Sequence, residues 1–292
     1  MKTQLNAAIK ATGVTVDEVT LFREMAKVFN TRVSSATYVE EVHNHKVEFW
    51  SRFGRNVEVE LGDLLLLTYD KATAELRICV LQAKYKKGRY YQFLNFKADI
   101  VQWELLKEKP IIFNKSRKFE FPSNILNFRD DYESITAYGI FFEDNISKEL
   151  DFLYTLPKYI WPHSMPARMV KNGRAFHFRC PKKLGSPKRM CRAGITAKET
   201  VSTCSIDVFE EQVLRCKVGA PINDKEVKKW VGQLLAGCKS RATVPDVIDE
   251  VLSYLDVETN IAEDKYELEE APAVMVVVTD SEKVEHRLPD CF

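Results

Sequence analysis

The chain has 292 residues, of which 45% are hydrophobic and 29% are charged, a balance typical of a soluble globular protein. No apolar run approaches the roughly 18 residues of a membrane span, and the first residues lack a signal-peptide core, so we expect a cytoplasmic protein without a membrane partner. The net charge of +1 hides a segregation of charge, because residues 152–198 contain eleven Lys and Arg but no Asp or Glu.

The chain begins with a predicted amphipathic helix over residues 16–30, in which apolar residues recur at helical spacing from Val19 to Phe29. Thr15 and Glu18 stand in the capping-box pattern, with Thr15 as the N-cap. We therefore expect this helix to begin close to Thr15.

Runs of β-forming residues and turn signals then predict several strands and a second helix. We predict strands over residues 46–53, 63–69 and 76–85, a helix from Phe93 to Leu106, and strands over 111–113 and 134–142. The order of helix, three strands, helix and strand predicts an α/β fold with a mixed sheet.

The character of the sequence changes past residue 160, where the basic, proline-containing segment begins. Helices are predicted over residues 224–238 and 245–256, and a strand over 273–278. We predict a domain of residues 1–160 and a C-terminal α+β region of residues 161–292. The C-terminal region would serve DNA binding, regulation or oligomerisation.

Three polar residues stand at the ends of two adjacent predicted strands. Asp63 begins one strand, and Gln82 and Lys84 lie near the end of the next, with a turn at residues 70–73 between them. Strand ends opposite a hairpin turn lie side by side, and residues two apart leave the same face of a strand. We therefore expect Asp63, Gln82 and Lys84 to converge.

This set of side chains suits the hydrolysis of phosphodiester bonds. The Asp63 carboxylate, the Gln82 amide oxygen and the Ala83 carbonyl are hard oxygen ligands suited to Mg²⁺ or Mn²⁺. The metal would polarise a phosphoryl oxygen and lower the pKa of a bound water, which Lys84 would orient. The opposing interpretation is that the three side chains lie on a solvated strand edge without a function.

The sequence of Asp63, a hairpin and then Gln82-x-Lys84 resembles the PD-(D/E)xK, or restriction-endonuclease-like, nuclease superfamily. The QxK variant is similar to that of Mrr-like restriction enzymes and antiviral effector nucleases, and Gly62 replaces the family's proline. The resemblance covers residues 15–145 in element order. It implies a restriction-endonuclease-like αβββαβ core with a mixed sheet, followed here by the smaller C-terminal α+β region. It also implies a metal-dependent endodeoxyribonuclease that acts in restriction or antiviral defence.

Many members of this family add an acidic residue from the first helix of the core. Glu24 is a candidate on the predicted helix. Glu40 and Glu41 are candidates if residues 36–43 form a helical turn before the first strand. The sequence does not choose among these three residues.

Basic residues continue from the motif and recur in the segment without acids. Nucleic-acid-binding proteins neutralise phosphates with such residues, and their affinity then depends on salt. The predicted nucleic-acid-binding residues are Lys86, Lys87, Arg89, Arg174, Arg179, Lys182, Lys183, Lys188 and Arg189. DNA is the expected partner by family analogy, although these residues do not separate DNA from RNA. A homodimer is expected if the target is duplex DNA.

Two other classes of protein remain open from the sequence. One is a catalytically inactive nucleic-acid-binding module on the same fold, in which Gln82 marks a decayed site. The other is a regulatory interaction subunit whose basic segment meets an acidic partner. A nuclease that awaits an activating ligand or a partner protein is a variant of the enzyme hypothesis.

Overall fold

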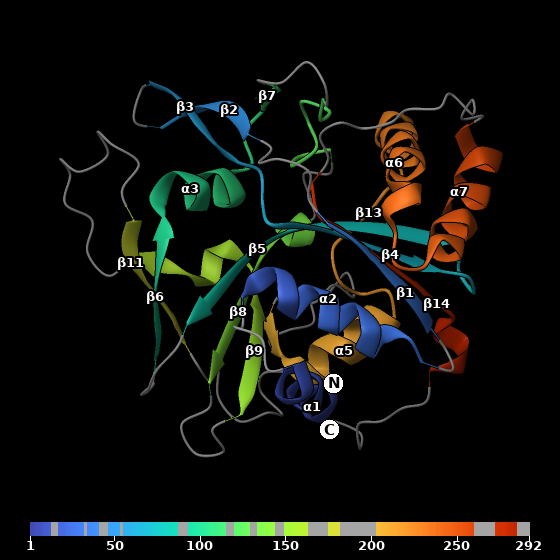
Figure 1. The fold of residues 1–292 in the computed structure, drawn as a ribbon. Coiled ribbons are helices and arrows are strands. Elements are labelled where there is room, and N and C mark those ends of the chain that lie inside the picture. The colour runs from blue at the N-terminus through green and yellow to red at the C-terminus, as the bar shows by residue number, and fades with distance from the viewer. Residues whose placement is uncertain are drawn as a thin grey trace.

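In the computed structural model, one mixed β-sheet forms the centre of this α/β protein, and helices cover both of its faces (Figure 1). The structure describes residues 1–12, 17–31, 34–40, 46–52, 55–86, 93–114, 120–128, 133–143, 149–162, 175–181, 203–259 and 272–284. Within these ranges, every helix is too short or too polar to cross a membrane.

The main sheet has the strand order β1-β14-β4-β5-β8-β9-β12, and the short strand β13 pairs with one end of β5. Its strands are β1 (Ser34–Val39), β4 (Leu64–Asp70), β5 (Glu75–Lys86), β8 (Thr136–Glu143), β9 (Leu150–Thr155), β12 (Thr203–Ser205), β13 (Ala220–Pro221) and β14 (Val274–Thr279). The hairpin β4–β5 is antiparallel, whereas β5 runs parallel to β8. The sheet is therefore mixed.

Different helices cover the two faces of this sheet (Figure 1). On one face lie α1 (Lys2–Thr12), α2 (Glu18–Phe29) and α5 (Ile206–Leu214), and on the other α3 (Ile100–Glu108), α6 (Lys225–Cys238) and α7 (Pro245–Thr259). Strand β4 is buried along its whole length, with Leu64 and Leu66 in one core and Leu65 and Leu67 in the other. Because strand side chains alternate between faces, an unbroken apolar run needs cover on both sides.

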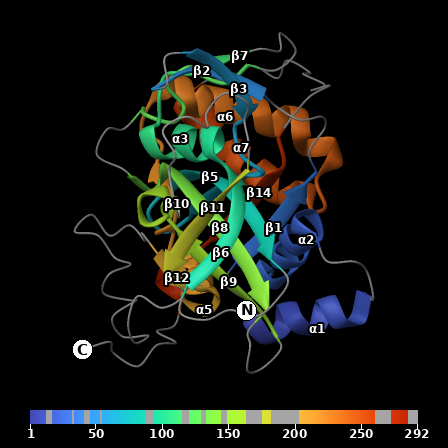
Figure 2. The same ribbon diagram turned by 90° about the vertical axis from the view of Figure 1, so that its left-hand side faces the viewer.

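Two small antiparallel sheets flank the main sheet (Figure 2). They consist of β10 (Trp161–Pro162), β11 (Ala175–Pro181) and β6 (Phe93–Asp99), and of β3 (Arg55–Glu60), β2 (Lys46–Ser51) and β7 (Phe113–Asn114), in these orders. Single 3₁₀ turns lie at Glu133–Ile135, Pro157–Tyr159, Lys239–Arg241 and Ser281–Lys283. Buried Glu104 ties α3 to β2, since its carboxylate accepts hydrogen bonds from Ser51 Oγ (2.8 Å) and Arg52 N (2.6 Å).

The structure confirms the elements that carry the motif. The predicted helix over residues 16–30 is α2, the strands over 63–69 and 76–85 are the hairpin β4–β5, and the strand over 134–142 is β8. The C-terminal predictions also hold as α6, α7 and β14.

The predicted helix from Phe93 to Leu106 is wrong in its first half, which forms strand β6. This strand pairs along its whole length with β11. Asp99 ends the strand and caps α3, because its side chain accepts a hydrogen bond from Val101 N (2.7 Å). Pairing with a distant segment leaves no local pattern, so the spacing of the apolar residues alone favours a helix there.

The first part of the core also differs from the prediction. Residues 34–39 form β1, the first strand of the main sheet, so the helical turn over 36–43 on which Glu40 and Glu41 depended as candidates does not form there. The predicted strand over 46–53 is β2, which belongs to a small sheet. The strand predicted over 111–113 is reduced to β7.

Strands from both ends of the chain share the main sheet. β14 lies between β1 and β4, antiparallel to the first and parallel to the second. Helices α5, α6 and α7 complete the two cores that the N-terminal elements begin. The division of the chain at residue 160 remains a prediction, and the main sheet takes strands from both sides of it.

We expect Val276→Ala to destabilise the whole protein in a single unfolding transition. Val276 is fully buried at the centre of β14, between Thr37 of β1 and Leu67 of β4. The loss of its methyl groups should cost about 2 kcal/mol. Urea unfolding followed by circular dichroism and by tryptophan fluorescence checks this. Two separate transitions, of which only one shifts, would show that the two parts of the chain fold independently.

Candidate active site

The end of the hairpin β4–β5 holds the Asp63 carboxylate in place. Asp63 directly precedes β4, and its backbone N–H donates to the Leu81 carbonyl (3.1 Å). Its Oδ2 accepts hydrogen bonds from the backbone N–H of Ala83 (2.6 Å) and from Nε2 of Gln82. The Asp63 carboxylate therefore accepts the hydrogen bond that a backbone carbonyl would accept from β5 if β4 were longer.

Gly62 directly precedes Asp63, and the close approach of β5 explains a glycine there. A Cβ at Gly62 would lie 2.8 Å from Cγ1 of Val80 and 3.3 Å from the Leu81 carbonyl oxygen. A larger residue would push the chain away from β5. The glycine thus keeps Asp63 within reach of the Ala83 N–H.

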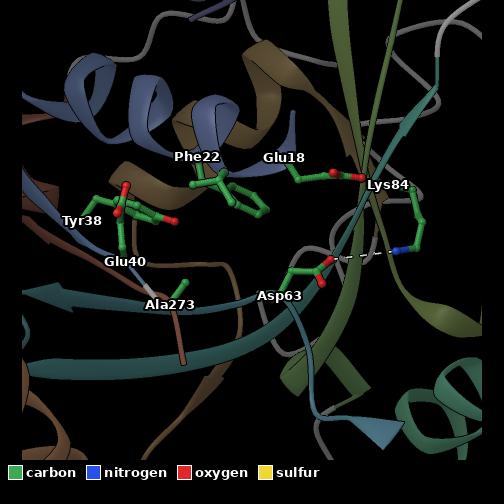
Figure 3. Close-up of a pocket in the computed structure, with 8 residues that line it drawn as sticks. Glu18, Phe22, Tyr38, Glu40, Asp63, Lys84 and Ala273 are labelled. Carbon is green, nitrogen blue, oxygen red and sulfur yellow. Dashed lines mark ion pairs between the residues drawn. The ribbon is translucent and has the colours of Figure 1, made fainter. Parts of the chain in front are cut away.

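Lys84 reaches the same carboxylate from two residues further along β5 than Gln82. Its Nζ lies 4.0 Å from Oδ2 of Asp63, and both side chains are about a quarter exposed, at 24% and 27% (Figure 3). Gln82 is buried, and its Nε2 also donates to the Ala83 carbonyl (3.3 Å). The structure thus brings together Asp63, Gln82 and Lys84.

Gln82 lies buried behind Asp63, and Asp63 and Lys84 border a pocket of about 420 Å³. Its lining comes from α2, from the ends of β1 and β5, and from the residues before β4 and β14. The lining residues are Glu18, Val19, Phe22, Tyr38, Glu40, Asp63, Lys84 and Ala273. A C-terminal segment therefore helps to form the pocket, which the sequence does not predict.

Glu18 is the acidic residue that the sequence reasoning missed. The sequence pattern predicts a capping-box role for Glu18 with Thr15, a residue that lies outside the described ranges. In the structure Asp17 caps α2, accepting a hydrogen bond from Thr20 N (2.7 Å). Glu18 is then the first residue of the helix, and its Oε1 accepts from the backbone N–H of Tyr85 (3.1 Å). A carboxylate in the first turn of a helix is favoured by the helix dipole. Because this local role already accounts for Glu18, the sequence gives no sign that Glu18 also lines the pocket.

The three acids proposed from the sequence differ in their relation to the pocket. Glu24 is buried, pairs with Nζ of Lys27 (2.7 Å) and does not line the pocket. Glu40 lines the pocket on the side away from Asp63 (Figure 3). It is ion-paired with Arg23. Glu41 lies outside the described residues.

Burial raises the pKa of the Asp63 carboxyl above its ordinary value, and the Glu18 carboxylate adds to this effect. The charge of Lys84 and the hydrogen bonds from Ala83 and Gln82 act in the opposite direction but do not cancel it. The site therefore holds its carboxylate at a cost in free energy. Such a perturbed group in a pocket is characteristic of functional sites.

The donor atoms at this site are compatible with a hard divalent cation. Carboxylate oxygens come from Asp63 and Glu18, and Oε1 of Gln82 is a buried oxygen without a hydrogen-bond partner among the described residues. Over the same residues, no three His, Cys, Asp or Glu side chains cluster closely enough to hold a metal. A cation would thus need the amide oxygen and a substrate phosphate as well, as Mg²⁺ sites with one or two carboxylates do.

The predicted nucleic-acid-binding residues are mostly beyond what the structure describes. Lys86 ends β5 and Arg179 lies on β11, but their side chains are outside the described part. Lys87, Arg89, Arg174, Lys182, Lys183, Lys188 and Arg189 fall outside the described residues altogether. Their role therefore stays a prediction.

Comparison with known proteins does not assign this chain to a family. No protein-family model matches the chain, and no curated protein matches it either. The function has to be inferred from the pocket itself.

We expect Asp63→Asn to stabilise the protein at neutral pH. A carboxyl whose pKa is raised by folding binds protons more readily in the folded state, so stability falls as the pH rises through that raised pKa. Asparagine keeps an oxygen for the Ala83 N–H and removes the partly buried charge. Thermal unfolding should show a Tm about 2 °C higher, the scale of a ~1 kcal/mol change in a large domain. The gain should shrink as the pH is lowered toward about 4, where an ordinary aspartate titrates. A variant less stable than the wild type at neutral pH would contradict this account of Asp63.

Proposed function

We propose that this pocket hydrolyses phosphodiester bonds of DNA with the help of Mg²⁺ or Mn²⁺. The observation that carries the proposal is the meeting of Asp63, Gln82, Lys84 and Glu18 at the end of one hairpin. The elements around them support it, because the hairpin is followed by α3 and by β8 parallel to β5. A hairpin, a helix and a further strand in this order are what the restriction-endonuclease-like resemblance implies, although β6 and β7 are inserted here and β3, the strand before the hairpin, belongs to a small sheet.

Each residue has a role that its position supports. Asp63, Glu18 and Oε1 of Gln82 would hold the cation, which supplies a Lewis acid for the phosphoryl oxygen and a more acidic water. Lys84 would orient the attacking water and stabilise the negative charge of the transition state. The Ala83 carbonyl, predicted as a further ligand, accepts a hydrogen bond from Gln82 in the structure and is the weaker candidate.

The charges of the pocket support a dependence on a cation. Three carboxylates, from Glu18, Glu40 and Asp63, face one ammonium group, from Lys84. Arg23 pairs with Glu40, so the excess of negative charge lies beside Asp63. A phosphate would be repelled there until a cation binds, because like charges at close range are unfavourable in a partly buried site.

One observation favours the alternative of an inactive nucleic-acid-binding module. Nε2 of Gln82 donates to Asp63, so the amide satisfies the carboxylate without any cation. A decayed site would keep this hydrogen bond as a structural contact. The two functions differ in metal dependence, since binding alone needs basic residues but no divalent cation.

Lys84→Ala should reduce cleavage of supercoiled plasmid DNA by about 100-fold or more while DNA binding persists. The loss of one group that stabilises transition-state charge commonly has an effect of this size. Cleavage by the full chain would be followed in Mg²⁺, in Mn²⁺ and in EDTA, and binding by a mobility-shift series in salt.

Lys239→Ala is the matched control for this variant. Lys239 is also paired with an aspartate, Asp249, at 2.5 Å, but it lies after α6 and does not line the pocket. Its substitution should leave cleavage unchanged. Undiminished cleavage by Lys84→Ala would refute the assignment, and salt-sensitive binding without cleavage in any metal would favour the inactive module.

Glu18→Gln should lower the cleavage rate by about tenfold or more and raise the Mg²⁺ concentration needed for half-maximal rate. Losses of this size follow when a group close to a metal site is removed. Glu24→Gln, six residues further along the same helix, is the control, because that side chain pairs with Lys27 and does not line the pocket. A larger loss in Glu24→Gln than in Glu18→Gln would show that the wrong acid has been assigned.

A further inference from the structure

Two buried polar atoms next to the Asp63 site have no hydrogen-bond partner among the described residues. They are Oε1 of Gln82 and the hydroxyl of Tyr138, whose residues are 1% and 0% exposed. Leaving buried polar atoms unpaired costs free energy, and such atoms in a native protein often have a catalytic or ligand-binding use. Their proximity to Asp63 points to a shared role at this site.

Gln82 and Tyr138 are direct neighbours in the main sheet. Gln82 of β5 is in register with Tyr138 of the parallel strand β8, and side chains in register project from the same face. Burial raises the pKa of the Tyr138 hydroxyl well above its ordinary value, and the carboxylates of Asp63 and Asp99 add to this effect. Tyr138 therefore stays protonated at neutral pH, and its hydroxyl can both donate and accept a hydrogen bond.

The orientation of the Gln82 amide conflicts with its proposed role as a ligand. In the structure Nε2 donates to Asp63, while Oε1 is left without a partner. A cation held beside Asp63 can use only the oxygen of the amide, because the NH₂ group has no free electron pair to offer. The amide must therefore turn over, which exchanges the positions of its oxygen and nitrogen. Nε2 then needs an acceptor in the buried position that Oε1 left.

We propose that Tyr138 is a positioning residue that accepts this hydrogen bond and so holds the Gln82 amide in its ligand orientation. The inference rests on the proposed metal site. In the structure the hydroxyl and Oε1 belong to neighbouring residues but do not hydrogen-bond to each other, so the hydroxyl oxygen is available as an acceptor for Nε2 of the turned amide. A phenylalanine would offer no acceptor. The residue that makes Gln82 usable as a ligand thus lies on a strand outside the motif.

The test is the affinity of the full chain for Mn²⁺, measured by isothermal titration calorimetry without DNA. Tyr138→Phe should weaken Mn²⁺ binding by about tenfold, because Nε2 of the turned amide would be buried without an acceptor. The Tm of the same variant without Mn²⁺ should be unchanged or slightly higher, because the lost hydroxyl has no partner among the described residues. A tyrosine with a purely structural role would instead lower the Tm and leave the affinity unchanged.

Two controls separate this role from general effects of the substitution. Tyr154→Phe removes a second fully buried hydroxyl, from β9 and the opposite core, and should not change the affinity. Tyr138→Phe should also have no further effect once Gln82→Ala has removed the amide. Wild-type affinity in Tyr138→Phe, or equal losses with and without the Gln82 amide, would overturn the role of Tyr138 alone. An absence of Mn²⁺ binding by the wild type would overturn the proposed metal site together with it.

Discussion

The pocket depends on the part of β5 that extends past the beginning of β4. The pairing of the two strands ends at Leu64 and Leu81, so the later N–H groups of β5 meet no strand on that side. Two of them, at Ala83 and Tyr85, donate instead to the carboxylates of Asp63 and Glu18. Buried backbone donors require acceptors, and here two acidic side chains take the place of strand carbonyls. The backbone at the end of β5 thus brings the two acids together, and Lys84 lies between the two donor residues, Ala83 and Tyr85.

This arrangement explains why α2 and the hairpin act as one unit. Glu18 joins the first turn of α2 to β5, while Phe22 of the same helix is buried against Phe141 of β8, with ring centroids 5.7 Å apart. The acids are held by a rigid sheet and a packed helix, which keeps them close together in spite of their repulsion. The pKa of Asp63 is raised mainly by burial, and the charge of Glu18 adds to this effect. Sites that hold such groups commonly lose stability to keep a function.

The parts of the site that are local in sequence could be predicted, and the parts that depend on distant segments could not. Asp63, Gln82 and Lys84 follow from strand alternation and hairpin geometry, which need only neighbouring residues. Glu18 escaped because its pattern already had a local explanation as a helix cap. Three features depend on pairing with distant strands: residues 93–99 form a strand, β14 lies inside the main sheet, and Tyr138 lies beside Gln82. Such pairing leaves no periodic signal in either partner alone.

A glutamine at position 82 has a physical consequence that a glutamate there would not have. A third carboxylate beside Asp63 and Glu18 would add negative charge to a buried site in which the pKa of Asp63 is already raised. The neutral amide instead donates to Asp63, so the acid is hydrogen-bonded before any cation binds. The amide can bind a cation in one orientation only, because it has a single oxygen, whereas a carboxylate has two. The buried hydroxyl of Tyr138 can donate or accept a hydrogen bond. In the proposed site it accepts one from the amide nitrogen and so holds the amide oxygen toward the cation. In the proposed metal site, the glutamine therefore supplies a ligand oxygen without adding negative charge, and the tyrosine fixes the orientation of that ligand.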